Sequence, residues 1–140
     1  MKDATAGYSG TPLHKKLGYK AQNRVSLIQA PDHYASLLDE LPFPVEWVNE
    51  EDEAIDLVHM FVKGKMEFER FLLASKQRIR QTGMIWVSWP KKASKVPTEL
   101  TEDYIREFAL GHGLVDVKVC AVDEVWSGLK LVIPVKSRTS

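Results

Sequence analysis

Residues 55–62, with the sequence IDLVHMFV, restrict the fold more than any other stretch because they are nearly continuous in apolar side chains. A strand with one face in water alternates apolar and polar residues, whereas a continuous apolar strand is covered on both faces. The run ends at Lys63 and Gly64, and residues 65–80 then place apolar side chains at helical spacing. A buried strand followed by an amphipathic helix is typical of the parallel sheet of an α/β protein.

Strands and helices alternate along most of the chain, and this order predicts a three-layer Rossmann-like α/β sandwich. Its sheet has about six strands and is mainly parallel, and the last two strands form a C-terminal antiparallel hairpin connected by residues 123–128. The expected strands lie at 24–30, 45–48, 55–62, 84–89, 115–122 and 129–135, and the expected helices lie at 12–17, from Pro31 to before Pro42, at 65–80, and from Thr101 to near Gly111.

Residues with strong positional preferences mark several helix ends. Thr11 and Thr101 are expected N-caps, because a threonine hydroxyl accepts a hydrogen bond from a free backbone N–H, and Pro12 suits the first helical position. Gly18 and Gly83 follow helical patterns. We expect them to end the first and third helices, because glycine adopts the left-handed conformation of a helix terminus without strain.

The composition restricts the class of protein. A chain of 140 residues suits one domain, expected at residues 11–136 between a flexible N-terminal tail, 1–10, and a C-terminal tail, 137–140. The 19 basic and 19 acidic residues balance, which argues against general nucleic-acid binding. The single cysteine, Cys120, excludes an internal disulfide and is typical of a cytoplasmic protein. No apolar run approaches the roughly 20 residues that span a bilayer, so no membrane contact is expected. The sequence carries no signal of oligomeric state.

Four stretches of the sequence form a specific combination of motifs. They are residues 7–13 (GYSGTPL), 89–94 (WPKKAS), 100–103 (LTED) and 115–130 (VDVKVCAVDEVWSGLK). Together they resemble a family of small bacterial proteins known as a domain of unknown function, DUF3052. The resemblance extends over nearly the whole chain from Gly7 and implies a bacterial, cytoplasmic protein. It supplies no activity, ligand or catalytic residue.

The predicted order of elements is also similar to a shortened form of the Rossmann-like fold of S-adenosylmethionine methyltransferases. Those proteins finish, as this chain does, with a helix and an antiparallel pair of strands. One helix between strands is missing here, near residues 49–53. The resemblance concerns architecture, and architecture alone does not establish function.

The turn after the first strand lacks the features of a nucleotide site. Residues 28–33 read IQAPDH and contain no glycine that would let the backbone approach a ligand closely. Pro31 removes one N–H donor, and Asp32 would repel a phosphate. Glu50 and Glu51 follow the second strand, where an acidic residue can hold a ribose, but they also suit a solvated turn. We therefore expect no nucleotide or S-adenosylmethionine cofactor.

No group in the sequence predicts catalysis or metal binding. Cys120 lies in an alternating strand, as a packed small residue does, and buried cysteines are usually inert. Ser127 does not lie in the Gly-x-Ser-x-Gly pattern of a hydrolase. His59 lies within the apolar run and is expected to be a core histidine whose hydrogen bonds are satisfied. No two histidines have the spacing of a helical zinc site, so no metal and no catalytic residue are predicted.

Charged side chains follow several strands at the point where each strand ends. In open α/β sheets, ligands bind beyond the carboxyl ends of the parallel strands. Lysine is a flexible point charge that suits phosphate or carboxylate, and a tryptophan there would supply a flat apolar wall. The ligand-binding residues predicted at this edge are Lys63, Lys91, Lys92, Lys95, Asp123, Glu124 and Trp126.

The segment before the first helix is a weaker candidate for the same site. Residues 7–11, GYSGT, contain two glycines and the hydroxyls of Ser9 and Thr11, and such a turn can bind an anion through backbone N–H groups. An ordinary capped helix with a flexible lead-in explains the same residues. In the same way, the acidic residues of the edge could pair with its lysines and form a structural network.

These observations support three hypotheses about function. The first is a non-catalytic binding module that holds a small anionic ligand, or the acidic surface of a protein partner, at the carboxyl edge of the sheet. The second is a degenerate methyltransferase-like enzyme that binds S-adenosylmethionine despite the altered turn. The third is a protein-interaction or assembly factor whose exposed hairpin, containing Trp126, meets a partner.

Overall fold

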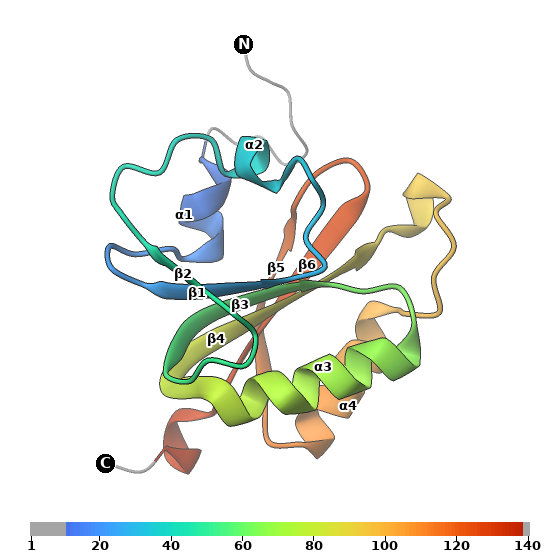
Figure 1. Ribbon diagram of the computed structural model, residues 1–140. Helices are drawn as coiled ribbons and strands as arrows, with labels where there is room; N and C mark the ends of the chain where they lie inside the picture. Colours follow the sequence, from blue (N-terminus) through green and yellow to red (C-terminus); the bar gives the residue numbers. More distant parts are fainter. Residues whose placement is uncertain (1–10, 139–140) are drawn as a thin grey trace.

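The computed structural model describes residues 11–138 and places helices on both faces of one six-stranded sheet (Figure 1). The predicted N-terminal tail, with Ser9, lies outside the described residues. The helices are α1 (Leu13–Leu17), α2 (Tyr34–Leu38), α3 (Lys65–Arg78) and α4 (Glu102–Gly111), with short 3-10 turns η1 (Lys92–Ser94) and η2 (Val135–Ser137). The strands are β1 (Arg24–Ile28), β2 (Glu46–Val48), β3 (Ile55–Phe61), β4 (Ile79–Pro90), β5 (Val115–Ala121) and β6 (Trp126–Val132).

The strands follow the order β2-β1-β3-β4-β6-β5 across the sheet. β1 pairs in parallel with β2 and β3, and β3 pairs in parallel with β4. β6 is antiparallel to both β4 and β5, so β5 runs in the same direction as the first four strands. The predicted three-layer Rossmann-like sandwich, with a mainly parallel sheet and a C-terminal antiparallel hairpin, is confirmed.

Two apolar cores lie on opposite faces of the sheet, one under α3 and α4 and the other under α1 and α2 (Figure 1). β3 contributes to both, since Met60 belongs to the first core and Phe61 to the second. This confirms what the continuous apolar composition of β3 predicts. Trp89 and Trp86 likewise belong to the first and second cores, because residues three apart on a strand face opposite sides.

The ends of α1 and α4 test the predicted capping residues. At α1, the N-cap position is Pro12 and not Thr11, and no side chain caps the helix. Gly18 is confirmed as the residue that ends α1, with a φ of 87°. At α4, Thr101 is confirmed as the N-cap, since its hydroxyl accepts a hydrogen bond from the N–H of Tyr104 at 3.1 Å.

The prediction that Gly83 ends the third helix is wrong, because α3 already ends at Arg78 and Gly83 lies within β4. β4 begins at Ile79, which pairs with Ile55 of β3. A Cβ atom at residue 83 would lie 2.9 Å from the carbonyl oxygen of Ile55. Glycine is therefore required here by a close approach of two backbones.

The helices differ greatly in length, and α2 is much shorter than predicted. It has 5 residues and begins at Tyr34, so Pro31 and Asp32 precede it and do not form its first turn. The longest helix, α3, has 14 residues. Within residues 11–138, no helix has both the length and the apolar composition needed to cross a membrane.

Candidate functional site at the carboxyl edge of the sheet

The carboxyl ends of β1, β3, β4 and β5 lie at one edge of the sheet, as the strand directions require (Figure 1). Contacts join the segments that follow these strands. The N–H of Lys91, after β4, donates to the carbonyl oxygen of Val125, between β5 and β6, at 2.8 Å. The Nε2 atom of His33, after β1, lies 3.1 Å from a carboxylate oxygen of Asp123, after β5. The topology thus brings together segments that are far apart in the sequence.

Gln29 occupies the turn after β1, where a Rossmann-like nucleotide site would receive its ligand. Its φ of 58° lies in the left-handed region that glycine adopts more readily. The side-chain amide of Gln29 donates to the carbonyl oxygen of Phe61 at 2.8 Å and reaches a carboxylate oxygen of Glu67 at 3.4 Å. A side chain of the protein therefore bridges the end of β1, the end of β3 and α3 at this position.

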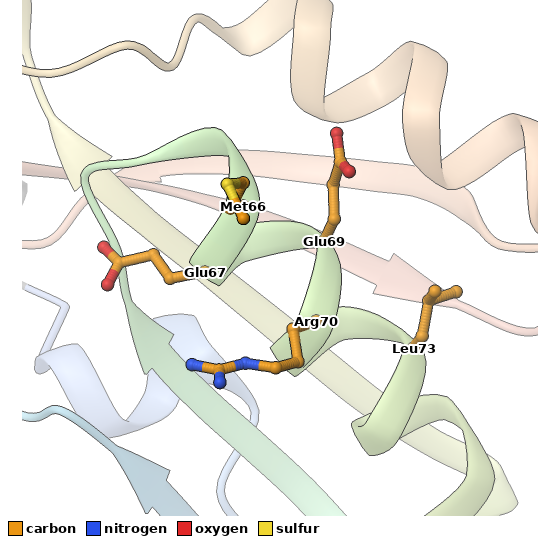
Figure 2. Close-up of a pocket in the computed structure, with 5 residues that line it drawn as sticks. All are labelled: Met66, Glu67, Glu69, Arg70 and Leu73. Atoms are coloured by element: carbon orange, nitrogen blue, oxygen red, sulfur yellow. The ribbon is translucent and has the colours of Figure 1, made fainter.

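Glu67 places a carboxylate of the protein itself at the N-terminal end of α3. It extends toward the end of β3 (Figure 2) and accepts hydrogen bonds from the N–H groups of Lys63 and Gly64 at 2.7 and 3.1 Å. Partial burial raises the pKa of Glu67, but these hydrogen bonds, the amide of Gln29 and the Lys63 ammonium together hold the pKa below its ordinary value. An external anion would have to displace this charged carboxylate to reach the end of α3.

A hollow of about 480 Å³ lies along the outer side of α3, next to Glu67 (Figure 2). Its described lining residues all belong to this one helix, and Met66 is 84% exposed. Figure 2 shows Met66 and Leu73 extending from this same helix. The hollow is a feature of the helix surface, and ligand pockets are usually more deeply enclosed.

Asp123 holds the connection between β5 and β6 in place. One of its carboxylate oxygens accepts hydrogen bonds from the N–H groups of Val125 and Trp126, both at 2.8 Å, and the other contacts His33. The side chain of Asp123 is 14% exposed. Its oxygens are therefore engaged within the protein, in a turn that links the segment after β5 to the segment after β1.

Trp126 lies at the start of β6, whereas the sequence places it in the connection between the last two strands. It pairs with Pro90 at the end of β4, so the antiparallel ladder begins three residues earlier than the predicted start at Leu129. The indole ring is half-buried and meets the ring of Phe61 edge to face, with centroids 5.0 Å apart. The pairing with β4 thus draws Trp126 into the core on the α1–α2 face.

The segment Lys91–Lys95, which we call the lysine loop, follows β4 as an ordered turn. The hydroxyl of Ser94 donates to the carbonyl oxygen of Lys91 at 2.7 Å, and the turn ends at Lys95 with a φ of 63°. Lys91 is half-buried, and Lys92 and Lys95 are exposed. Internal hydrogen bonds therefore fix the backbone of the loop and leave three ammonium groups at the surface.

The lysine loop forms no ion pair with the acidic residues beside it. Asp123 contacts His33 instead, and Glu124 is exposed and has no ion pair among residues 11–138. Seven contacts between arginine or histidine and acidic side chains are formed among residues 11–138, and none of them involves Lys91, Lys92 or Lys95. Within residues 11–138, Asp123 and Glu124 therefore do not neutralise the lysines of the loop by ion pairing.

Two other residues predicted for the site lie apart from the lysine loop. Lys63, after β3, is exposed, and its ammonium acts on the carboxylate of Glu67. Its carbonyl oxygen accepts hydrogen bonds from the N–H of Glu99 and the hydroxyl of Thr98. Thr11 is exposed before α1, and no hydrogen bond among the described residues links it to the carboxyl edge.

A set of four hydrogen-bonded side chains, which we call the buried polar chain, lies in the α1–α2 core below this edge. The hydroxyls of Tyr19 and Tyr34 are 2.7 Å apart, and the Tyr34 hydroxyl lies 2.9 Å from Nδ1 of His59. Nε2 of His59 lies 2.7 Å from the hydroxyl of Ser88. Both ring nitrogens of His59 are satisfied, which confirms the predicted core histidine.

Burial keeps the buried polar chain uncharged at neutral pH. It lowers the pKa of His59 to about 3 and raises the pKa values of Tyr19 and Tyr34 above the ordinary value for tyrosine. Sequence reasoning missed the partners of His59 because they come from segments 25 and 29 residues away. The only available signal was the presence of a polar residue within an apolar strand.

The described residues show no accessible arrangement for nucleophilic catalysis, because Ser88 and His59, which are hydrogen-bonded as a nucleophile and its base would be, are both fully buried. No group of three histidine, cysteine or acidic side chains among residues 11–138 is placed to hold a metal ion. Cys120 is half-buried, and burial raises the pKa of its thiol despite the nearby ammonium groups of Lys16 and Lys118. A thiol with a raised pKa is a poor nucleophile at neutral pH, because the thiolate is the reactive form.

Residues 44–135 match the model of a family described as a protein of unknown function, DUF3052. The chain belongs to this family. The match includes the lysine loop, Glu67 and the connection between β5 and β6. No curated protein matches the chain. Membership in DUF3052 confirms the family that the sequence motifs indicate, although the match begins at residue 44 and leaves the motif at residues 7–13 outside it.

Solved structures similar to this member of DUF3052 include methyltransferases. A SAM-dependent methyltransferase from Aquifex aeolicus has a TM-score of 0.57 at 14% identity, covering 87% of this chain and 88% of that chain. Precorrin-6y C5,15-methyltransferase from Geobacter metallireducens has a TM-score of 0.59 at 13% identity, covering 86% and 84%. A TehB-like SAM-dependent methyltransferase from Corynebacterium glutamicum has a TM-score of 0.56 at 10% identity, covering 83% of each chain. These similarities confirm a methyltransferase-like Rossmann fold.

Proposed function

We propose that this protein is a non-catalytic binding module of the bacterial cytoplasm, which holds an anionic ligand or the acidic surface of a partner at the carboxyl edge of its sheet. The lysine loop supplies the main contacts, and Lys63, after β3, lies apart from it beside Glu67. Carboxylate and phosphate groups are the chemistry that lysine ammonium groups recognise.

The observation that carries this proposal is the contrast between ordered backbone and unpaired charge in the lysine loop. Three ammonium groups have no ion-pair partner within residues 11–138, although the backbone that bears them is fixed by hydrogen bonds from Lys91 to Val125 and from Ser94 to Lys91. A fixed backbone lowers the entropy that binding must overcome. A partner would therefore meet three lysines on a backbone segment that is already ordered before binding.

The arrangement after β1 supports binding in preference to methyl transfer. The side chain of Gln29 bridges the turn, and Glu67 occupies the N-terminal end of α3. The helix after this turn, α2, has only 5 residues, so few peptide dipoles add up to attract an anion at its N-terminal end. A degenerate methyltransferase-like enzyme is the alternative that the fold favours, and it requires S-adenosylmethionine to bind despite these groups.

The test is a thermal-shift series on the wild-type protein with ATP, citrate, inorganic pyrophosphate and poly-glutamate. We expect at least one probe to raise Tm and the rise to shrink in Lys91→Ala/Lys92→Ala. The matched control is Lys15→Ala/Lys136→Ala, which removes two exposed lysines of α1 and η2. Because exposed charges are screened, the rise should also weaken in 0.5 M salt, where the Debye length falls to roughly 4 Å.

Two results would contradict the proposal. If no probe raises Tm in the wild type, or if the double variant of the lysine loop responds as the control does, the loop is only a solvated turn. Calorimetry with S-adenosylmethionine tests the enzymatic alternative, which requires measurable heat of binding. A pull-down compares wild type with Trp126→Ala. The assembly-factor hypothesis requires a partner that binds the wild type and does not bind the variant, which lacks the half-buried Trp126.

A further inference from the structure

A hollow of about 520 Å³, which we call the Trp47 hollow, lies beside β1 and β2 on the α1–α2 face. Its walls come from the end of β1, from α2 and the residues after it, and from Trp47 of β2. Figure 1 shows the chain arching from α2 over this region before it enters β2. The volume lies in the range of small-molecule pockets, roughly 300–1,000 Å³.

The hollow exists because the outer strands of the sheet have little helical cover on this face. α2 has 5 residues, and the chain reaches β2 through an irregular segment without a second helix. Leu27 of β1 is consequently only half-buried, and Trp47 of β2 is 51% exposed. Trp47 continues the apolar walls of the hollow into one contiguous apolar surface, and such surfaces are candidate binding sites.

The walls of the hollow are apolar, and its rim carries negative charge. Leu27, Leu38 and Leu41 line it together with the rings of Tyr34 and Trp47. The hydroxyl of Tyr34 is already bonded to Tyr19 and His59, so this residue offers its ring and not a polar group. The hollow can therefore hold an apolar body, with polar recognition left to the rim.

Three carboxylates, those of Asp32, Asp39 and Glu40, stand at the rim, and all three residues are exposed. None of them forms an ion pair within residues 11–138. No lysine, arginine or histidine is among the described residues that line the hollow. The local charge is thus negative and uncompensated, the opposite of the charge at the lysine loop.

We propose that the Trp47 hollow binds a small organic cation, a protonated amine or quaternary ammonium on an apolar body. The apolar body would fill the space between the leucines and Tyr34, and the cation would lie near the carboxylates and the face of Trp47. Tryptophan is the aromatic residue that attracts cations most strongly, because of the negative potential of its ring face. An anionic ligand would meet three carboxylates and be repelled. This site is independent of the proposed function of the lysine loop.

The test uses benzyltriethylammonium as the cation, benzyl alcohol as a neutral aromatic probe and benzenesulfonate as an anion. Each is titrated into the full-length protein, and the indole N–H signals are followed by ¹H–¹⁵N NMR. The signal of Trp47 is identified by its loss in Trp47→Phe. The indole N–H of Trp86 donates to the carbonyl oxygen of Leu17 within the core and serves as an internal reference.

We expect the cation to shift the Trp47 signal in a saturable way and to leave the Trp86 signal in place. Replacing Trp47 by alanine should weaken binding roughly two- to fivefold, as expected for an exposed cation–π contact. Because this variant lacks the Trp47 signal, its binding is followed through the backbone N–H signals of Ala35 and Leu41, which also line the hollow. Asp39→Asn/Glu40→Gln should weaken it by a similar factor, because two of the three rim charges are removed. Glu107→Gln is the matched control, since Glu107 is an exposed carboxylate on α4, which lies on the opposite face.

Four outcomes would overturn the proposal. The first is no shift of the Trp47 signal at tens of millimolar cation, and the second is equal shifts with the neutral probe. The third is an affinity for the cation that Asp39→Asn/Glu40→Gln leaves unchanged, which would make the hollow a general apolar surface. The fourth is binding of a lysine-rich peptide without binding of the small cation, which would assign the hollow to a basic protein partner. All variants are first checked for the Trp86 signal, which reports a folded core.

Discussion

The buried polar chain and the lysine loop are two groups of polar side chains that differ in whether their polar groups have partners within the protein. In the buried polar chain, the ring nitrogens of His59 are bonded to Tyr34 and Ser88, and burial keeps the imidazole neutral. In the lysine loop, the backbone is bonded and the ammonium groups are not paired within residues 11–138. Polar groups that the fold itself requires are satisfied internally, so charges left unpaired on an ordered loop are the better candidates for binding.

The largest effect is expected in the buried polar chain, where His59→Ala should destabilise the protein by roughly 3–5 kcal/mol. The change leaves a cavity and removes the partner of the Tyr34 and Ser88 hydroxyls, both of which are buried. Denaturant unfolding followed by fluorescence measures the free energy of unfolding. Lys91→Ala/Lys92→Ala, in contrast, should change it by less than about 0.5 kcal/mol. Equal losses for both variants would remove the distinction between the two groups.

The second effect is a dependence of stability on pH that arises from His59. Its pKa is about 3 in the folded protein, against 6.5 for an ordinary histidine. As the pH falls below 6.5, the unfolded chain takes up a proton at this residue and the folded protein does not. The stability that His59 contributes is thus present above pH 6.5 and is lost toward pH 3, by roughly 1–1.5 kcal/mol per pH unit.

Comparing wild type with His59→Gln at pH 6.5 and 4.5 isolates this contribution, because all other titrating groups are shared. We expect the wild type to lose roughly 2–3 kcal/mol more than the variant over this range. The variant Lys91→Ala/Lys92→Ala should keep the full pH dependence. An NMR titration in which the His59 imidazole becomes protonated above pH 5 would contradict the prediction without relying on a destabilised variant.

Much of the architecture follows from the sequence because the signals are local. The apolar run that becomes β3 predicts a strand buried on both faces, and the amphipathic helix that follows it predicts a parallel sheet. The parallel sheet in turn predicts that Lys91 and Asp123 lie at the same edge, and the backbone hydrogen bond from Lys91 to Val125 agrees with this. Strand direction is thus enough to group residues that are 32 positions apart.

The details that decide what the edge can bind depend on contacts that no local pattern encodes. Gln29 bridges the turn after β1 through partners 32 and 38 residues away, and Trp126 joins β6 because Pro90 continues the ladder. Gly83 suits a helix terminus by its position in the sequence, but the close approach of Ile55 explains it in three dimensions. The Trp47 hollow likewise arises from missing helical cover, which leaves no residue signal of its own.

A third and smaller effect separates two neighbouring acidic residues of the edge. Asp123→Ala should destabilise the protein by roughly 1–3 kcal/mol, because it removes charge-assisted hydrogen bonds to the N–H groups of Val125 and Trp126. Glu124→Ala should have almost no effect, since Glu124 is exposed. Thermal or denaturant unfolding compares the two variants. If both variants lower the free energy of unfolding equally, Asp123 is not the residue that holds the turn. The turn would then not be evidence that the neighbouring lysine loop is ordered.

The smallest effect on stability, and the most direct test of the comparison, is expected for single lysines of the loop. Lys92→Ala should leave Tm within the error of the measurement, because the side chain is exposed and has no ion pair within residues 11–138. Binding of whichever anionic probe raises Tm should nevertheless weaken, by about the same factor as in Lys95→Ala.

Lys92→Arg keeps the charge and should retain most of the binding, because a carboxylate or phosphate is attracted by either cation. A loss of binding in Lys92→Arg equal to that in Lys92→Ala would point to a shaped pocket around one ammonium group. Retention of full binding in Lys92→Ala and Lys95→Ala alike would move the anion site away from the lysine loop, toward Lys63 and the end of β3.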